Sequence, residues 1–215
     1  MKRSDCLYAI FFTAATLLAA CGEKEYVYPD LVTEIACLDT DDKGFGIRIV
    51  TDEGTVWRLS EGNRPDSLTA DSTYRVLAKF APRNDDEATA YTLQKVISPL
   101  PKPESEYPVI RTDPVRIQSV WRSGEYLNMV LQVMMKDRPH SLSFIENGIE
   151  TDADGRQTLT LTLYHDRNED AEAFYRKSYL SVPLWHYQGR LTKGDRIVLH
   201  LNTYEEGTVT RSFIY

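Results

Sequence analysis

The residues of this sequence that could do acid–base or metal chemistry are its histidines and the carboxylates beside them. The histidines are His140, His165, His186 and His200. Carboxylates follow the second of these, so His165, Asp166 and Asp170 could bind a metal, or His165 and Asp166 could form a hydrolase centre. However, no His-x-x-x-His or Glu-x-x-His pair presets two ligands on one face. A strand that ends in an acidic loop explains the same residues.

Other patterns for catalysis or ligand binding are incomplete. No Gly-x-Ser-x-Gly elbow accompanies the histidines, and no glycine-rich loop could cradle a phosphate. Asp152-Ala153-Asp154-Gly155 resembles the start of a calcium loop, but its twelfth position is Leu163 rather than glutamate. We therefore assign no catalytic residue, no metal ligand and no cofactor.

Aromatic residues are the remaining candidates for binding. Trp185 and Tyr187 follow a proline and precede Gln-Gly, so their rings could lie on a loop and stack on a sugar or a peptide. We take these two residues as candidate ligand contacts. Trp57 and Trp121 lie within strand patterns and are expected to pack against the core or an edge.

The N-terminus has the parts of a bacterial lipoprotein signal. Lys2 and Arg3 precede an apolar stretch that is too short to span a bilayer comfortably, and Leu18-Ala19-Ala20-Cys21 closes it. Residues 1–20 are therefore predicted to be a signal peptide, Cys21 to carry lipid, and residues 21–30 to form a tether. This places the protein in the cell envelope, anchored in the outer membrane on a face that the sequence leaves open. An ordinary secretory signal and an uncleaved anchor are the alternatives.

Processing changes the charge and the cysteine count. Removing 20 of the 215 residues leaves 195, and the loss of Lys2, Arg3 and Asp5 reduces 25 basic and 32 acidic residues to 23 and 31, a net charge of −8. An acidic surface repels phosphate backbones, so we expect no nucleic-acid partner. With Cys21 lipidated, Cys37 is the single remaining cysteine, and it is expected to be a buried, inert thiol.

The first folded block, residues 31–98, is predicted to be an OB-like β-barrel. Short strand patterns separated by turn signals occur at 32–38, 45–50, 55–59, 73–80 and 90–97. Alternation selects the core candidates Val56, Leu59, Val76, Leu93 and Ile97. A small sandwich or an SH3-like barrel is the competing interpretation. In a barrel, Phe45, Trp57 and Tyr74 could bind a sugar, or simply be buried.

The rest of the chain is predicted to be a linker and a second β-domain. Residues 99–112 are rich in proline, which favours an extended, semi-rigid linker over a long surface loop. Residues 113–215 contain seven strand patterns, at 115–121, 126–134, 140–145, 158–165, 177–182, 196–203 and 208–214. Seven strands in about 100 residues fit an antiparallel β-sandwich, so the fold class is all-β. Residues 168–176 form one helical window.

Several strings in this sequence resemble the NigD-like lipoproteins of Bacteroidetes. They are the lipobox at Cys21, Gly44-Phe45-Gly46-Ile47, Gly54-Thr55-Val56-Trp57, Asp113-Pro114-Val115, Val120-Trp121-Arg122-Ser123-Gly124-Glu125-Tyr126-Leu127-Asn128, Leu163-Tyr164-His165-Asp166 and Gly194-Asp195-Arg196-Ile197-Val198-Leu199. The resemblance covers nearly the whole mature chain. It implies an OB-like domain followed by a β-sandwich, and a bacteriocin-immunity role suggested by the operon that names the family. It implies no active-site residue.

These observations together predict a lipid-anchored, non-enzymatic envelope protein. Cys21 connects it to the membrane, and its partner is another macromolecule, as for a bacteriocin-immunity protein. The alternative is a glycan- or peptidoglycan-binding lipoprotein that uses Trp185 and Tyr187. A hydrolase or a metal enzyme around His165 and Asp166 ranks third.

Overall fold

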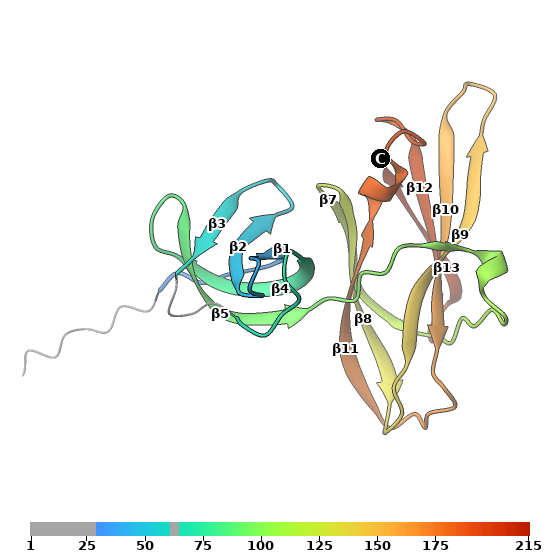
Figure 1. Ribbon diagram of the computed structural model, residues 1–215. Coiled ribbons are helices and arrows are strands. Elements are labelled where there is room, and N and C mark those ends of the chain that lie inside the picture. The colour runs from blue at the N-terminus through green and yellow to red at the C-terminus, as the bar shows by residue number, and fades with distance from the viewer. Residues whose placement is uncertain (1–28, 61–64) are drawn as a thin grey trace, which may run out of the picture. The chain divides into compact units, whose positions relative to one another are not determined.

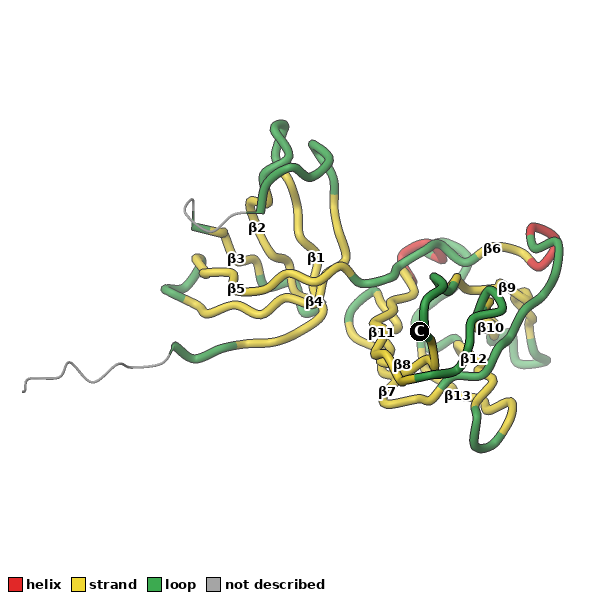
Figure 2. Tube along the Cα trace, turned by 90° about the horizontal axis from the view of Figure 1, so that it is seen from below, coloured by secondary structure: helices red, strands yellow, loops and turns green. Residues whose placement is uncertain are grey.

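The computed structural model describes residues 29–60 and 65–215. The predicted signal peptide, Cys21 and most of the predicted tether lie outside these ranges, as does the middle of the connection after residue 60. No helix in the described ranges has the length and apolar character needed to cross a membrane. Two short 3-10 turns, η2 (Glu104–Glu106) and η3 (Leu184–Tyr187), are the helical elements there, and strands and loops form the remainder (Figure 2).

The N-terminal strands close into a five-stranded barrel, as expected for an OB-like fold (Figure 1). The strands are β1 (Val32–Thr40), β2 (Gly46–Thr51), β3 (Val56–Leu59), β4 (Thr73–Pro82) and β5 (Glu87–Lys95). Their order around the barrel is β1-β2-β3-β5-β4, and β4 returns to pair with β1. Only β3 and β5 run parallel; the other pairs are antiparallel. Closure removes the unpaired edges that an open sheet of this size would expose.

Side chains from alternate positions fill the barrel. Of the predicted core residues, Leu59 and Val76 are buried and Leu93 packs against the cluster from a half-buried position. Val56 and Ile97 are exposed, so those two predictions are wrong. Val56 is the first residue of β3, beyond the tight turn at Gly54. Ile97 lies past the end of β5, where the chain leaves the barrel, so alternation no longer applies.

The C-terminal strands form two facing sheets. One sheet has the order β13-β12-β10-β9-β6 and the other β11-β8-β7. Their bounds are β6 (Lys102–Pro103), β7 (Arg116–Ser123), β8 (Tyr126–Met135), β9 (Ser141–Thr151), β10 (Gln157–Asp166), β11 (Phe174–Pro183), β12 (Arg196–Thr203) and β13 (Gly207–Ile214). Most pairs are antiparallel, but β10 and β12 run parallel because β11 crosses to the opposite sheet between them.

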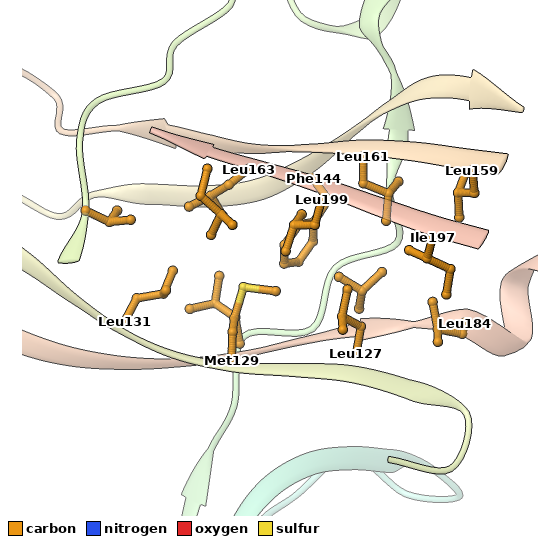
Figure 3. Close-up of a cluster of buried hydrophobic side chains, with 14 of the residues drawn as sticks. Leu127, Met129, Leu131, Phe144, Leu159, Leu161, Leu163, Leu184, Ile197 and Leu199 are labelled. Atoms are coloured by element: carbon orange, nitrogen blue, oxygen red, sulfur yellow. The ribbon is translucent and has the colours of Figure 1, made fainter. Parts of the chain in front are cut away.

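Strict alternation builds the sandwich core. Leu127, Met129 and Leu131 of β8 point toward leucines of β10 and β12 in the other sheet (Figure 3). Each of these three side chains is fully buried. Burying one such side chain stabilises the fold by roughly 1.5–3 kcal/mol, so this row supplies much of the driving force for sandwich formation.

The proline-rich segment is part of the sandwich and does not span a gap between domains. Lys102 and Pro103 form β6, which pairs in parallel with β9 at the sheet edge. The hydroxyl of Tyr107 lies 3.0 Å from that of Ser143 and donates to the carbonyl of Phe144, also at 3.0 Å. Proline lacks an N–H but keeps its carbonyl, which is why it is tolerated in an edge strand. Residues 102, 103 and 107 of the predicted linker are thus bonded to β9.

The predicted helical window at 168–176 is also wrong. Asn168 and Glu169 adopt positive φ angles of 55° and 54°, and residues from Phe174 onward belong to β11. The carboxylate of Asp170 accepts the backbone N–H groups of Lys136 and Asp137 from the β8–β9 turn. These long-range bonds replace the local hydrogen bonds that a helix would need.

Candidate functional site

A buried cluster of polar side chains joins the barrel to the sandwich. Arg75 of β4 lies at its centre, with a side chain only 3% exposed. Its Nη2 donates to Oδ2 of Asp52 at 2.8 Å, and its Nη1 lies 2.6 Å from Oδ1, off the N–H axis. This ion pair links β4 to the turn that follows β2, within the barrel.

The guanidinium also reaches into the sandwich. Nη2 donates to Oδ1 of Asn128 at 3.0 Å, and Nε donates to Oγ of Ser181 at 3.0 Å. Asn128 in turn donates from Nδ2 to Oδ2 of Asp52 at 2.9 Å, and the hydroxyl of Ser181 donates to Oδ1 of Asn128. Four side chains from β4, the β2–β3 turn, β8 and β11 thus form one connected network, in which Oδ1 of Asp52 has an ion-pair contact but no hydrogen bond. We call this set the junction lock: Asp52, Arg75, Asn128 and Ser181.

Backbone contacts support the same junction. Ile97 donates its N–H to the carbonyl of Tyr179 and accepts the N–H of Ser181, each at 2.9 Å. Gly124, in the β7–β8 turn, has a φ of +52°, and a Cβ there would lie 2.2 Å from the carbonyl oxygen of Asp52. Only glycine permits this approach.

A cavity of about 390 Å³ opens beside the junction lock. Its lining comes from both modules and consists of Cys37, Val50, Thr51, Asp52, Glu53, Gly54, Glu125 and Tyr126. The pKa of nearby Glu34 is raised by burial and by the carboxylates of Asp52 and Glu53. On the barrel side of this cavity, Glu53 is a further carboxylate beside that of Asp52, which pairs with Arg75.

Cys37 and Tyr126 meet in the wall of this cavity. The sulfur of Cys37 lies 3.3 Å from the hydroxyl of Tyr126, and Nη1 of Arg75 approaches it at 3.6 Å. Burial, followed by the contact with Cys37, raises the pKa of Tyr126 to about 12. Cys37 is half-buried rather than fully buried, and it is a free cysteine.

The structure separates the two aromatic candidates. Trp185 lies in η3, is 43% exposed, and is close enough to Tyr126 to oppose the rise in the pKa of that hydroxyl. Tyr187 is fully buried, and its hydroxyl donates to Oε2 of Glu146 at 2.9 Å. Only Trp185 therefore presents an aromatic face to a ligand, at the edge of the junction. An i, i+2 spacing on a 3-10 turn directs the two rings to different sides.

The histidine candidates lie elsewhere in the sandwich. His165 is buried in β10, and its ring contacts that of His140. The ring of His140 in turn lies 3.5 Å from the carboxylate of Asp170. Asp166 is not brought into this group and lies 3.4 Å from Nε of Arg111. Within residues 29–60 and 65–215, no group of three His, Cys, Asp or Glu side chains has the geometry of a metal site.

Sequence reasoning did not identify the junction lock. Arg75 is 23 to 106 residues from its three partners, so no local spacing connects them. One signal was available: Asn128 and Arg75 are polar residues inside the strand patterns at 126–134 and 73–80. A polar residue in a strand with two buried faces must find a partner.

Comparison with known families agrees with this architecture. Residues 98–215 match the model of the NigD-like C-terminal β-sandwich domain. The chain belongs to the NigD-like family. The matched range includes the proline-rich segment, as the pairing of β6 requires.

Solved structures with the same fold come from related bacteria. A NigD-like immunity protein from Bacteroides caccae is 25% identical, with a TM-score of 0.69, and the match covers 88% of this chain and 99% of that one. A candidate toxin-related protein from Parabacteroides distasonis is 16% identical (TM-score 0.67; 86% and 93% covered). A candidate lipoprotein from Bacteroides fragilis is 12% identical (TM-score 0.57; 86% and 96% covered). A search of curated proteins found no match.

Proposed function

We propose that this NigD-like protein is a lipid-anchored envelope protein that binds a proteinaceous toxin. By binding the toxin, it protects the cell that carries this lipoprotein. The observation that carries the proposal is the near full-length likeness to the NigD-like immunity protein, at 25% identity over 88% of this chain. Both modules are included in that likeness, so the proposed activity belongs to the barrel and the sandwich together.

The junction lock supports a binding role for a surface built from both modules. A buried ion pair that is hydrogen-bonded to side chains of both modules holds its neighbours in one arrangement, and pre-organised surfaces lose less entropy when they bind. Trp185 projects from this junction, and tryptophan is enriched among the residues that dominate binding energies. Glu53 and Glu125 line the adjacent cavity and favour a partner surface that carries Lys or Arg.

The anchor is a separate part of the proposal. Lipidation of Cys21 would attach at least two acyl chains, and each buried CH₂ adds about 0.8 kcal/mol to membrane affinity. Labelling cells with radioactive palmitate tests it. We expect label on the wild-type protein and none on Cys21→Ser, with the wild type recovered in the outer-membrane fraction. Equal labelling of both would exclude this anchor.

Protection against killing is the direct test of function. A strain lacking the gene and its parent are co-cultured with toxin-secreting Bacteroidetes strains, and survivors are counted. We expect at least tenfold fewer survivors without the gene, and protease treatment of the producer's medium should abolish the difference. Equal survival against every producer would overturn the immunity role.

Complementation locates the binding surface. Trp185→Ala should fail to restore survival, whereas Tyr91→Ala should restore it, because Tyr91 is 54% exposed on β5 and belongs neither to the junction lock nor to the lining of the adjacent cavity. Both proteins must accumulate to wild-type levels. Restoration by both variants would exclude Trp185 as a contact.

A glycan- or peptidoglycan-binding role is the alternative, and the exposed ring of Trp185 is the observation that favours it. Near this ring, the side-chain amide of Gln188 donates to Glu125 at 2.6 Å. Sugar-binding sites commonly combine an exposed aromatic ring with polar side chains of this kind. Retention of the mature protein on murein or capsular polysaccharide, abolished by Trp185→Ala, would support it.

A further inference from the structure

Two histidines lie ring to ring inside the sandwich. Nδ1 of His140 is 2.9 Å from Nε2 of His165. The side chain of His140 is 4% exposed, and His165 as a whole is 1% exposed. Each nitrogen of such a buried pair must be assigned as a donor or an acceptor, because water cannot supply the missing partner.

The partner of His165 decides the first assignment. Its Nδ1 lies 2.9 Å from the backbone carbonyl oxygen of Asp113, which can only accept a hydrogen bond. Nδ1 of His165 therefore carries a hydrogen. Burial lowers the pKa of His165, against the opposing effect of the Asp113 carbonyl, so the ring is neutral and its Nε2 is an acceptor. It follows that Nδ1 of His140 is the donor between the rings.

The other nitrogen of His140 is then the critical atom. Nε2 of His140 is buried, has no hydrogen-bond partner, and lies 3.5 Å from Oδ2 of Asp170. That oxygen already accepts the N–H of Lys136 at 2.6 Å, and Oδ1 accepts the N–H of Asp137 at 3.1 Å. A neutral His140 would direct the lone pair of Nε2 toward a carboxylate, which is repulsive.

Asp170 is held as an anion. Burial by itself would raise the pKa of Asp170, but the backbone N–H groups of Lys136, Asp137, Arg138 and Ala171 outweigh it and keep that pKa well below its ordinary value. A carboxylate with this many N–H donors is ionised throughout the neutral range. It faces His140 as a fixed negative charge.

We infer that His140 binds a proton in the folded protein and serves as a proton-dependent clasp between the β8–β9 turn and the β10–β11 connection. The imidazolium donates from Nδ1 to His165 and directs its Nε2 hydrogen toward Asp170. The clasp consists of His140, His165 and Asp170. Loss of the proton replaces an attraction across the two loops by a repulsion.

The other charged groups around the clasp are engaged elsewhere. Arg138 donates to the carbonyl of Asn168, Arg167 lies 3.8 Å from Asp113, and Asp166 pairs with Arg111. Lys136 lies 3.3 Å from Asp137 through its side chain. None of these contacts places a cation against Nε2 of His140, so a proton is the charge that fits the site.

Nuclear magnetic resonance of the histidine ring nitrogens in the folded, full-length protein tests the assignment without a mutation. At pH 7.5 we expect imidazolium shifts at both nitrogens of His140 and a neutral, Nδ1-protonated ring at His165. His200, which contacts Thr210 at the surface, provides a reference resonance in the same spectra. A neutral ring at His140 under these conditions would overturn the inference.

Hydrogen exchange tests the mechanical consequence. The amides of Lys136 and Asp137, which donate to Asp170, should lose about tenfold protection as His140 deprotonates, after correction for the intrinsic rate. In His140→Gln this pH dependence should vanish, whereas His200→Gln should retain it. Equal behaviour of the two variants would show that the clasp does not depend on His140. The NMR measurement uses only the wild-type protein, so it still tests the inference if a variant fails to fold.

Discussion

Replacing Arg75 by methionine removes the cation from the junction lock while retaining the volume of the side chain. The carboxylate of Asp52, which is 7% exposed, then loses both contacts with the guanidinium, and Asn128 and Ser181 each lose a donor. The guanidinium also lies 3.7 Å from the centre of the Tyr126 ring, and this cation–π contact is lost as well.

The magnitude follows from the burial of the pair. Removing one partner of a buried ion pair costs about 3–5 kcal/mol, because the remaining charge stays desolvated. Asn128 still donates to Asp52, which offsets a part of this cost. We therefore expect Arg75→Met to lower the free energy of unfolding by about 3 kcal/mol.

Urea unfolding followed by hydrogen-exchange mass spectrometry measures the effect in each module. In the wild type, peptides from β1–β5 and from β8–β13 should unfold with one midpoint, since the lock couples them. In Arg75→Met the two sets should separate, the barrel unfolding first. Arg48→Met is the matched control: Arg48 pairs with Asp39 at 2.6 Å, but 52% of its side chain is exposed, so its loss should cost less than about 1 kcal/mol.

A double variant distinguishes charge burial from lost packing. Arg75→Met combined with Asp52→Leu removes both charges, and the pair should recover about 2 kcal/mol relative to Arg75→Met alone. If Arg75→Met unfolds with a single midpoint and within about 1 kcal/mol of the wild type, the lock does not couple the modules and our reasoning on the junction is wrong.

Three further changes test other contacts. Gly124→Ala, which brings a Cβ against the carbonyl of Asp52, should lower stability by about 2 kcal/mol in urea unfolding, and an unchanged midpoint would contradict the close approach. Tyr187→Phe removes a hydrogen bond to Glu146 and should cost about 1.5 kcal/mol by the same assay; no loss would show that the bond is immaterial. The pKa of Asp170 is depressed in the fold, so its stabilisation is complete above the unfolded value of about 3.9 and is lost as the pH falls through the folded value. Asp170→Asn should therefore destabilise the protein at pH 7 and progressively less toward pH 3, as thermal unfolding against pH would show; a penalty independent of pH would contradict this.

The local pattern of apolar residues was sufficient to predict most of the strands. The alternation of Leu159, Leu161 and Leu163 predicts β10, whose observed bounds extend the prediction by one residue at each end. This succeeds because a period of two in apolar residues is imposed by the geometry of a half-buried strand. The same alternation misplaces Val56 and Ile97, since it cannot show where a strand ends.

Contacts between distant residues account for features that the local pattern does not show. Asp170 is bound by backbone groups some 34 residues earlier, which prevents the helix that its own neighbourhood suggests. Tyr187 follows an exposed tryptophan in sequence but is buried, because its hydroxyl reaches Glu146 on β9. No window of neighbouring residues contains these partners.

The sequence by itself determined that this protein is all-β, that two modules follow one another, and which family it resembles, because periodicity, turn residues and family strings are local properties of the chain. Only the tertiary structure decided that Arg75 joins the modules, that Trp185 rather than Tyr187 is exposed, and that His140 faces Asp170. Those outcomes depend on which polar groups meet after burial, when each must find a partner in the absence of water.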